Sequence, residues 1–410
     1  GDLLVTARGV IDQALNAGMS VGGNVSLNAN SGRDAIILDE VNNSFGSITV
    51  EGSDVSITEV DASTDFDFAD VESLTLIAAG DVNATGQMIV ESDLDILAAN
   101  GSGDVTLDNP GNELNRLTVE ADDVVIVNNE ATRLTEIDAG SLTLTSTGNV
   151  TDGEDELEVA GLASISTDGN ITLGTNNPVQ FGSLAVSGIN VNITQTGDIN
   201  LDTSSVTGTL DLASTEENIF GIAGADIEVD NDTALVTGEN AAIDFGESIN
   251  RFGDLTLVTG SAVVAETDDV SIEFIDADSL VLESAANITD ITAAEISILN
   301  DATFIAGDNI LLGDGESDQF NAGNIDLTAI NATITESSGT QIEGINLDGS
   351  LTLTSGGDVT DRENALLNVI GSVTIDADGG IADIVLNNSQ NEFGSVDFTG
   401  STVQLNETQS

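Results

Sequence analysis

Residues 141–152 read SLTLTSTGNVTD, and this stretch decides the fold because copies of it recur along the chain. Close copies begin at Ser73, Ser279 and Ser350, and two weaker copies begin at Asp2 and Thr209. The weaker copies, DLLVTARGVIDQ and TLDLASTEENIF, fill the gaps between the stronger ones. A fixed period of this kind is the sequence signature of a protein built from stacked repeats.

The six starts divide the chain into units of about 70 residues, which we interpret as one continuous β-solenoid over residues 1–410. The predicted units are 2–72, 73–140, 141–208, 209–278, 279–349 and 350–410. A second marker, an Asn-x-Phe-Gly-like element, keeps the same period at Phe45, Leu114, Phe181, Phe252, Phe320 and Phe393. The position after it holds only Gly or Asn, so we expect a tight corner with positive φ there.

Each unit holds a shorter repeat as well. In SLTL the leucines and threonines alternate, and this period of two predicts half-buried strands. Leu144, Ile165 and Val186 are spaced by 21 residues, and elsewhere the spacing reaches about 26. We therefore predict an all-β, parallel β-helix with about three coils per unit and about 18 coils in total. We expect it to be right-handed, as parallel crossovers normally are. Residues 9–20 are the one stretch for which a short helix is an alternative.

Composition excludes several classes of partner. Lys and Arg total 6, Asp and Glu total 72, and the net charge is −66. Such a chain repels nucleic acid and anionic membrane surfaces, because both require clustered basic residues. No apolar run approaches the ~18 residues that span a membrane. We therefore expect neither a nucleic-acid partner nor a membrane span.

The acidic clusters are the candidates for a site. The loop GDGESD (313–318) comes closest to a calcium loop, with Asp314, Glu316 and Asp318 as candidate ligands, because Ca²⁺ takes carboxylate oxygens. It matches neither an EF-hand nor the Gly-rich nonapeptide of calcium-binding β-rolls, and a solvated corner loop is the alternative interpretation. Ca²⁺ is thus the ion to consider, and we expect no required cofactor.

Catalytic residues are not predicted. A polysaccharide-active enzyme on a β-helix is the alternative, because paired carboxylates serve glycoside hydrolysis. The chain has no His, Cys, Trp or Tyr and no Lys, which removes the commonest general base, the thiol nucleophile and the aromatic platforms that bind sugars. No unit carries a long insertion that would house an active site. We therefore expect a protein that is not an enzyme.

Four runs carry a resemblance to a known family: GSLTLTSTGNVTD (140–152), GNITL (169–173), QFGSLAVSGINVNITQTGDINL (180–201) and NEFGSVDFTGSTVQL (391–405). They resemble the repeat regions of large bacterial surface exoproteins, similar to filamentous haemagglutinin and other two-partner-secretion adhesins. The resemblance covers essentially the whole chain. It implies a right-handed parallel β-helix that is secreted to the cell surface and works as an adhesin, stalk or matrix fibre. The amino-terminal secretion domain of that family is not recognisable in this chain.

Two hypotheses on function follow. The first is a structural extracellular protein, the shaft of an adhesin or a surface or matrix filament of a bacterium. No polar cap is evident, and open solenoid ends present unpaired strand edges, so we expect end-to-end self-association or continuation of a longer array. The second is a module that binds carbohydrate or Ca²⁺ along one face, with a cell-surface or carbohydrate partner. Its basis is the density of carboxylates and of outward Thr and Asn side chains.

Overall fold

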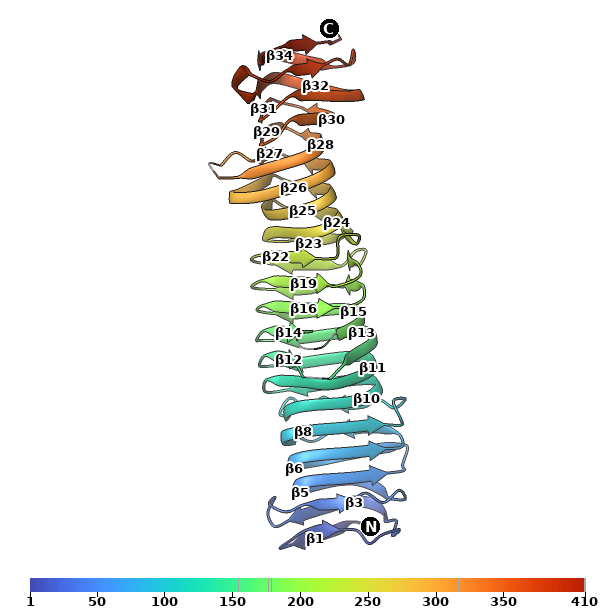
Figure 1. Cartoon of the computed structure of the whole chain (residues 1–410). Coiled ribbons are helices and arrows are strands. Elements are labelled where there is room, and N and C mark those ends of the chain that lie inside the picture. The colour runs from blue at the N-terminus through green and yellow to red at the C-terminus, as the bar shows by residue number, and fades with distance from the viewer. Residues whose placement is uncertain (154, 176, 178, 316, 409–410) are drawn as a thin grey trace. The chain divides into compact units, whose positions relative to one another are not determined.

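The computed structural model describes residues 1–153, 155–175, 177, 179–315 and 317–408. Two compact units divide the chain, Gly1–Ile199 and Asn200–Ser410. Both are built almost entirely of parallel β-strands (Figure 1).

The first unit consists of short and long strands that follow one another in coils. They are β1 (Leu3–Ala7), β2 (Ile11–Asp12), β3 (Ser20–Ala29), β4 (Ile36–Leu38), β5 (Ser44–Glu59), β6 (Ser63–Ala78), β7 (Asp81–Ala84), β8 (Met88–Ala98), β9 (Val105–Leu107), β10 (Glu113–Asn128), β11 (Thr132–Ser146), β12 (Val150–Asp152), β13 (Leu157–Thr167), β14 (Ile171–Leu173), β15 (Val179–Gly188) and β16 (Val191–Gln195). Strand β17 (Ile199–Leu201) contains the point at which the chain is divided.

The second unit has the same construction and one short 3₁₀ turn. Its elements are β18 (Ser204–Val206), β19 (Leu210–Ser214), β20 (Ile219–Gly221), β21 (Asp226–Val229), β22 (Thr233–Val236), β23 (Ala242–Arg251), β24 (Asp254–Glu266), β25 (Val270–Ser284), β26 (Ile288–Ala306), β27 (Asn309–Leu312), β28 (Gln319–Ala329), β29 (Asn331–Glu336), β30 (Thr340–Leu347), β31 (Leu351–Ser355), β32 (Val359–Ala377), η1 (Asp378–Gly380), β33 (Ile384–Leu386), β34 (Glu392–Thr399) and β35 (Val403–Leu405).

Each coil pairs with the next in parallel register, which confirms the predicted β-solenoid. On the SLTL strand, Val124 of β10 pairs with Leu142 of β11, and Leu142 pairs with Ala163 of β13. The two units together hold about 20 coils, close to the predicted number. The described part of the chain contains no helix with the length and apolarity needed to cross a bilayer.

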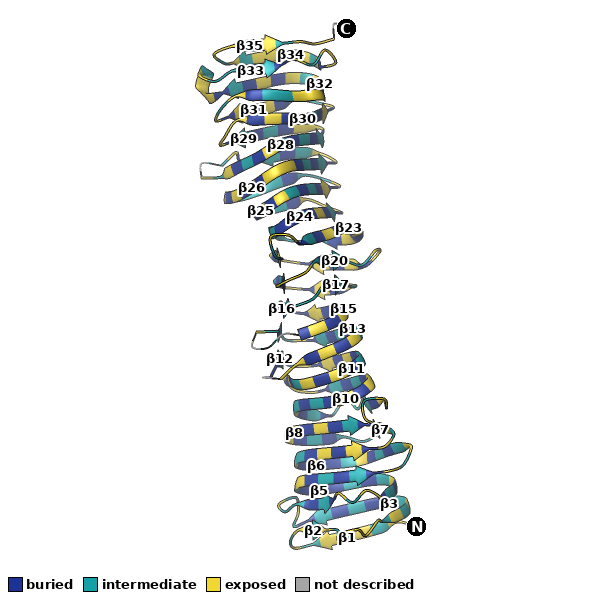
Figure 2. Cartoon of the chain, turned by 45° about the vertical axis from the view of Figure 1, so that its right-hand side comes forward, coloured by how far each residue is buried: buried dark blue, intermediate teal, exposed yellow. Residues whose placement is uncertain are grey.

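The core of each unit is a stack of aliphatic ladders, as the alternation predicts. Strand β31 (LTLTS) buries every second residue, and the same alternation colours the strands in Figure 2. Leu142 and Leu144 are both buried, with their threonine neighbours turned outward. The Phe column also faces the core: five of its six members are buried, and Phe393 is half-buried.

The prediction of a left-handed corner after the Phe column is wrong. Gly46, Gly182, Gly253 and Gly394 are not among the glycines with positive φ. Their glycine character has another cause: a Cβ at these positions would come within 2.9, 2.2, 1.5 and 2.2 Å of backbone oxygen atoms one coil earlier. The column therefore marks a close approach of two backbones.

The alternative of a helix over residues 9–20 is also wrong. The segment contains strand β2 and a short turn instead. Ile11 pairs with Ile36 of the following coil, so a parallel ladder takes the place of local helical hydrogen bonds.

Candidate functional site

The Asp that ends the SLTLTSxGNVTD motif accepts hydrogen bonds from the loop of the following coil. In the third copy, Asp152 accepts hydrogen bonds from the Gly174 N–H (3.1 Å) and the Thr175 hydroxyl (3.3 Å). In the sixth copy, Asp361 accepts from the N–H groups of Asn387 (2.9 Å) and Asn388 (3.0 Å). Both carboxylate oxygens are used in each case. The motif Asp is thus a structural acceptor in these two copies.

A column of buried asparagines lies beside this position, two residues before the Phe column. Its members are Asn43, Asn112, Asn250 and Asn391, all fully buried. Asn250 shows the pattern: its Nδ2 donates to the carbonyls of Phe245 and Ala265, both at 2.8 Å. Asn43 and Asn112 make the equivalent pairs of bonds. In the fifth copy this position is Asp318, a residue that lacks the amide donor.

In two other copies the amide of this column binds the motif position directly. Asn43 Nδ2 donates to Gln13 Oε1 (3.0 Å) in the first copy, where Gln replaces the motif Asp. Asn391 Nδ2 donates to Asp361 Oδ2 (3.2 Å) in the sixth copy. The fifth copy places Asp318 opposite Asp290 instead, so two carboxylates face each other where the first and sixth copies have an amide and an acceptor.

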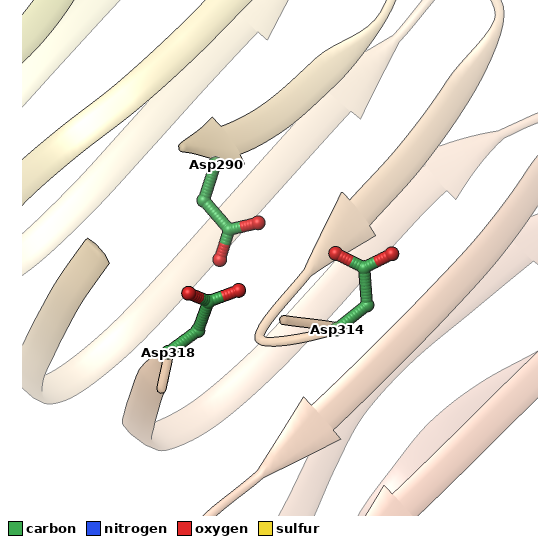
Figure 3. Close-up of side chains that lie close together, drawn as sticks. All are labelled: Asp290, Asp314 and Asp318. Carbon is green, nitrogen blue, oxygen red and sulfur yellow. The ribbon is translucent and has the colours of Figure 1, made fainter. Parts of the chain in front are cut away.

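Asp290, Asp314 and Asp318 form the resulting cluster (Figure 3). One carboxylate oxygen from each lies within 4.8 Å of the others. Asp290 belongs to β26, whereas Asp314 and Asp318 belong to the loop between β27 and β28. The structure thus brings together two of the three predicted ligands and adds Asp290, which the sequence interpretation missed. The third predicted ligand, Glu316, lies outside the described residues.

Backbone N–H groups satisfy part of the negative charge in this cluster. Gly313 N–H donates to Asp290 Oδ2 (2.7 Å), and Asp318 accepts from the N–H groups of Ala293 (2.6 Å) and Gly315 (2.6 Å). Asp290 Oδ1 is buried and has no hydrogen-bond partner within the described chain. Burial, reinforced by the like charges of Asp318 and Asp314, raises the pKa of Asp290 to about 6. The carboxyl of Asp290 therefore holds its proton to a higher pH than an ordinary Asp does.

The spacing of the oxygens is compatible with Ca²⁺. Ca²⁺ binds oxygen at about 2.3–2.6 Å, so two of its ligands stand at most about 5 Å apart. The three carboxylate oxygens lie within 4.8 Å of one another and satisfy this limit.

A groove lies on the outer face of the first unit. Its volume is about 280 Å³, and it crosses β6, β8, β10 and β11. Two outward ladders line it, Thr75–Asp95–Thr118–Glu136 and Ile77–Leu97–Glu120–Asp138. Burial raises the pKa of Asp95. The lining contains no aromatic side chain and no basic side chain, so it lacks both a stacking platform for sugars and a group that binds anions.

A second hollow, of about 310 Å³, lies in the second unit. It is lined by Thr237, Glu239, Asn240, Val258, Thr259, Asp276, Ala277 and Asp278. The Thr237 hydroxyl donates to that of Thr259 (2.7 Å), so these polar groups already satisfy one another.

Comparison with known proteins identifies the repeat but not a role. A family model described as repeats of unknown function (DUF5649) matches residues 1–50, 52–119, 121–187, 188–259 and 329–399. Four of these segments begin about one coil before the SLTL strand of a predicted unit. No curated protein and no solved structure matches the chain.

Proposed function

This chain belongs to the family of repeats of unknown function (DUF5649), and from that premise we propose that it is a structural repeat protein of the bacterial surface, the shaft of an adhesin or of a matrix filament. The observation that carries the proposal is the uniformity of the coils. The same buried ladders, asparagine column and close-approach glycines recur from unit to unit. A solenoid of this kind sets a length, because each coil adds about 4.8 Å.

The extracellular location and the adhesin role are part of the proposal and rest on the resemblance to filamentous haemagglutinin-like exoproteins. Antibodies raised against residues 1–410 provide the test. Immunogold labelling of intact bacteria that express the native gene should decorate the cell surface or material around the cells. Labelling that appears only after the cells are permeabilised would overturn the location.

End-to-end association is the form of self-assembly that we propose. In the first coil, the inward side chains of Leu3 and Val5 remain half-buried, whereas their ladder partners Val25 and Leu27 are fully covered. Further coils stacked on β1, from a second copy or from a longer array, would cover this surface and pair its edge. Electron microscopy over a range of protein concentrations should show particles that lengthen by multiples of one chain. Particles that keep the length of one chain at every concentration would count against self-assembly.

A calcium-binding role is the second candidate, and the carboxylate pair Asp290–Asp318 favours it. Here Asp314 is the third ligand, and Ca²⁺ would supply the positive charge that the amide hydrogens of Asn43 and Asn391 supply in the first and sixth copies. Calorimetric titration of chelator-treated protein with CaCl₂ should show one binding event per chain that Asp318→Asn removes. Asp308→Asn, which changes an exposed carboxylate nearby, should leave that event in place. Identical isotherms for the wild type and Asp318→Asn would exclude the site.

A further inference from the structure

A second column of buried polar side chains recurs in five of the six repeats. Its members are Glu59, Asn128, Gln195, Glu266 and Glu336, all 6% exposed or less. Each accepts a hydrogen bond from the backbone N–H of the residue 14 positions earlier, at the Phe column or two residues after it. The distances run from 2.6 Å for Phe45 N to Glu59 Oε1 to 3.2 Å for Phe181 N to Gln195 Oε1.

In the two amide copies the other end of the side chain is a donor. Asn128 Nδ2 donates to the Leu114 carbonyl (2.8 Å) and to the Thr132 hydroxyl (2.8 Å). Gln195 Nε2 donates to the Phe181 carbonyl (3.2 Å). The amide therefore makes a pair of hydrogen bonds with one corner residue: it accepts from the backbone N–H and donates to the backbone C=O. Both backbone groups of that residue are thus hydrogen-bonded.

In the three acid copies the second atom is a buried oxygen: Glu59 Oε2, Glu266 Oε1 and Glu336 Oε2. Glu266 Oε1 has no hydrogen-bond partner within the described residues. Hydrogen bonding with Thr64 and Thr340 lowers the pKa of Glu59 and Glu336, but burial raises the pKa of each more strongly. An ionised Glu266 would be an uncompensated buried charge with an unfilled acceptor. A carboxylic acid has the O–H that the position lacks.

We propose that this column is a repeat-encoded proton site, in which each buried glutamate is a neutral acid that donates its proton where the amide copies donate an N–H. Loss of that proton then removes the hydrogen bond that the acid donates and destabilises the corner. The glutamate copies respond to pH in this way, and the Asn128 and Gln195 copies do not.

The charges around the glutamates support a neutral acid. Burial raises the pKa of Glu59 and Glu336, and it raises the pKa of Glu266 to about 8. Glu266 lies between Asn250 of β23 and Ser284 of β25, both neutral. The charged groups that face it are Asp268, which raises its pKa further, and Arg251, which lowers it. Arg251 is itself held by Glu228 at 3.0 Å, so it is already paired. Asp61 and Asp65 add like charge at Glu59.

The sign of the pH effect follows from this shift. The folded pKa of Glu266 lies above its ordinary value of 4.5, so the folded chain keeps a proton that the unfolded chain releases. The stabilisation is complete below pH 4.5 and is lost as the pH rises to about 8. In that window each pH unit lowers the folding equilibrium constant about tenfold for this one carboxyl group.

The test compares Glu266→Gln with the wild-type chain in urea unfolding from pH 5 to pH 8.5. Glutamine keeps the shape and supplies the donor, so the variant should match the wild type near pH 5 and become increasingly more stable as the pH rises. Glu283→Gln removes an exposed carboxylate from the neighbouring strand, and its difference from the wild type should not follow this profile. Parallel pH profiles for Glu266→Gln and the wild type would overturn the proposal.

Two further measurements keep the proposal open to refutation if Glu266→Gln folds poorly. Gln195→Glu introduces the acid into an amide copy, and the chain should then lose stability between pH 5 and pH 8.5 more steeply than the wild type; an unchanged slope contradicts the proposal. Infrared spectra at pH 7 should show protonated carboxyl groups in the wild type, with a smaller signal in a chain carrying Glu59→Gln, Glu266→Gln and Glu336→Gln. An equal signal in both chains means that the column is ionised and refutes the idea.

Discussion

Three of the buried asparagines, Asn43, Asn112 and Asn250, hold their corners because each one donates to two backbone carbonyls. Asn112 Nδ2 binds the carbonyls of Leu107 (2.9 Å) and Val127 (3.2 Å), and these residues lie on different strands of the coil. A buried carbonyl without a partner costs about 1–3 kcal/mol. The column therefore stabilises the corner by supplying hydrogen-bond donors to buried carbonyls. Among the described members of the column, only Val179, in the third copy, has no polar side chain.

Replacing Asn250 by Ala should lower the free energy of unfolding by about 2 kcal/mol or more, because two buried carbonyls lose their donor. The midpoint of urea unfolding measures this change. Asn129→Ala provides the matched control, since Asn129 is exposed. That control should change stability by no more than about 0.5 kcal/mol. Equal effects of the two substitutions would mean that the column does not hold the corner.

The pKa of Asp290 predicts how the proposed calcium site depends on pH. Because this pKa is raised to about 6, a proton occupies the carboxyl at lower pH and competes with Ca²⁺. We expect the Kd for Ca²⁺ to weaken by up to about tenfold per pH unit below pH 6 and to level off above pH 7. Calorimetric titrations at pH 5, 6 and 7.5 measure this dependence. A Kd that is the same at all three values would contradict a role for Asp290 as a ligand.

The strands act as interchangeable elements because successive coils present the same faces. Leu142, Leu144 and Ser146 of β11 pair in register with Val124, Ile126 and Asn128 of β10. The glycine after the Phe column lets adjacent backbones approach, and the ladders shift register there, for example between Phe181 and Ser183, on either side of Gly182. Deleting or adding a whole unit thus preserves both the alternation of buried and exposed residues and the contacts at the corners. Deleting a single residue disturbs both.

Removing residues 73–140, one predicted unit, should leave a folded chain, because the new junction joins Glu72 to another SLTL strand at Ser141. Removing Thr143 alone should reverse the faces of the following residues and turn Leu144 outward. The loss of one buried leucine costs about 2–5 kcal/mol. Circular dichroism and thermal melting measure both variants. A deletion of 73–140 that unfolds as readily as the deletion of Thr143 would contradict the unit boundaries.

The charge of the molecule sets its dependence on salt. The net charge is −66, with only six basic residues. Ion pairs such as Arg116–Asp93 (2.7 Å) and Arg251–Glu228 (3.0 Å) lie at the surface, where each contributes about 0–1 kcal/mol. They offset little of the repulsion among the carboxylates. Repulsion of this kind favours the expanded, unfolded chain.

The melting temperature should therefore rise as NaCl increases from about 10 mM, where charges interact over about 30 Å, to about 1 M, where the range is about 3 Å. We expect the rise to be several degrees and to level off at the highest salt. Differential scanning calorimetry measures it, and sucrose, which adds no ions, serves as the control for general solvent effects. A melting temperature that does not change with NaCl would show that the repulsion does not limit stability.

The sequence by itself determined the coils and their core. The period of two within SLTL is a local signal, and the period of about 70 residues between its copies is a repeated one. Both can be recognised from the sequence without knowledge of the contacts. The Gly/Asn column was visible as well, but its cause was not. A close approach between Gly253 and Asn231 depends on how two coils stack, which spacing along the chain does not reveal.

Only the tertiary structure decided which polar groups meet. Asp290 lies 28 residues before Asp318 in sequence, yet the coil places them face to face, because a residue in a solenoid has neighbours one turn away. The same stacking buries Glu266 under the corner at Phe252, 14 residues earlier. Whether an inward glutamate is charged or neutral depends on the donors that surround it, and these come from other strands of the coil.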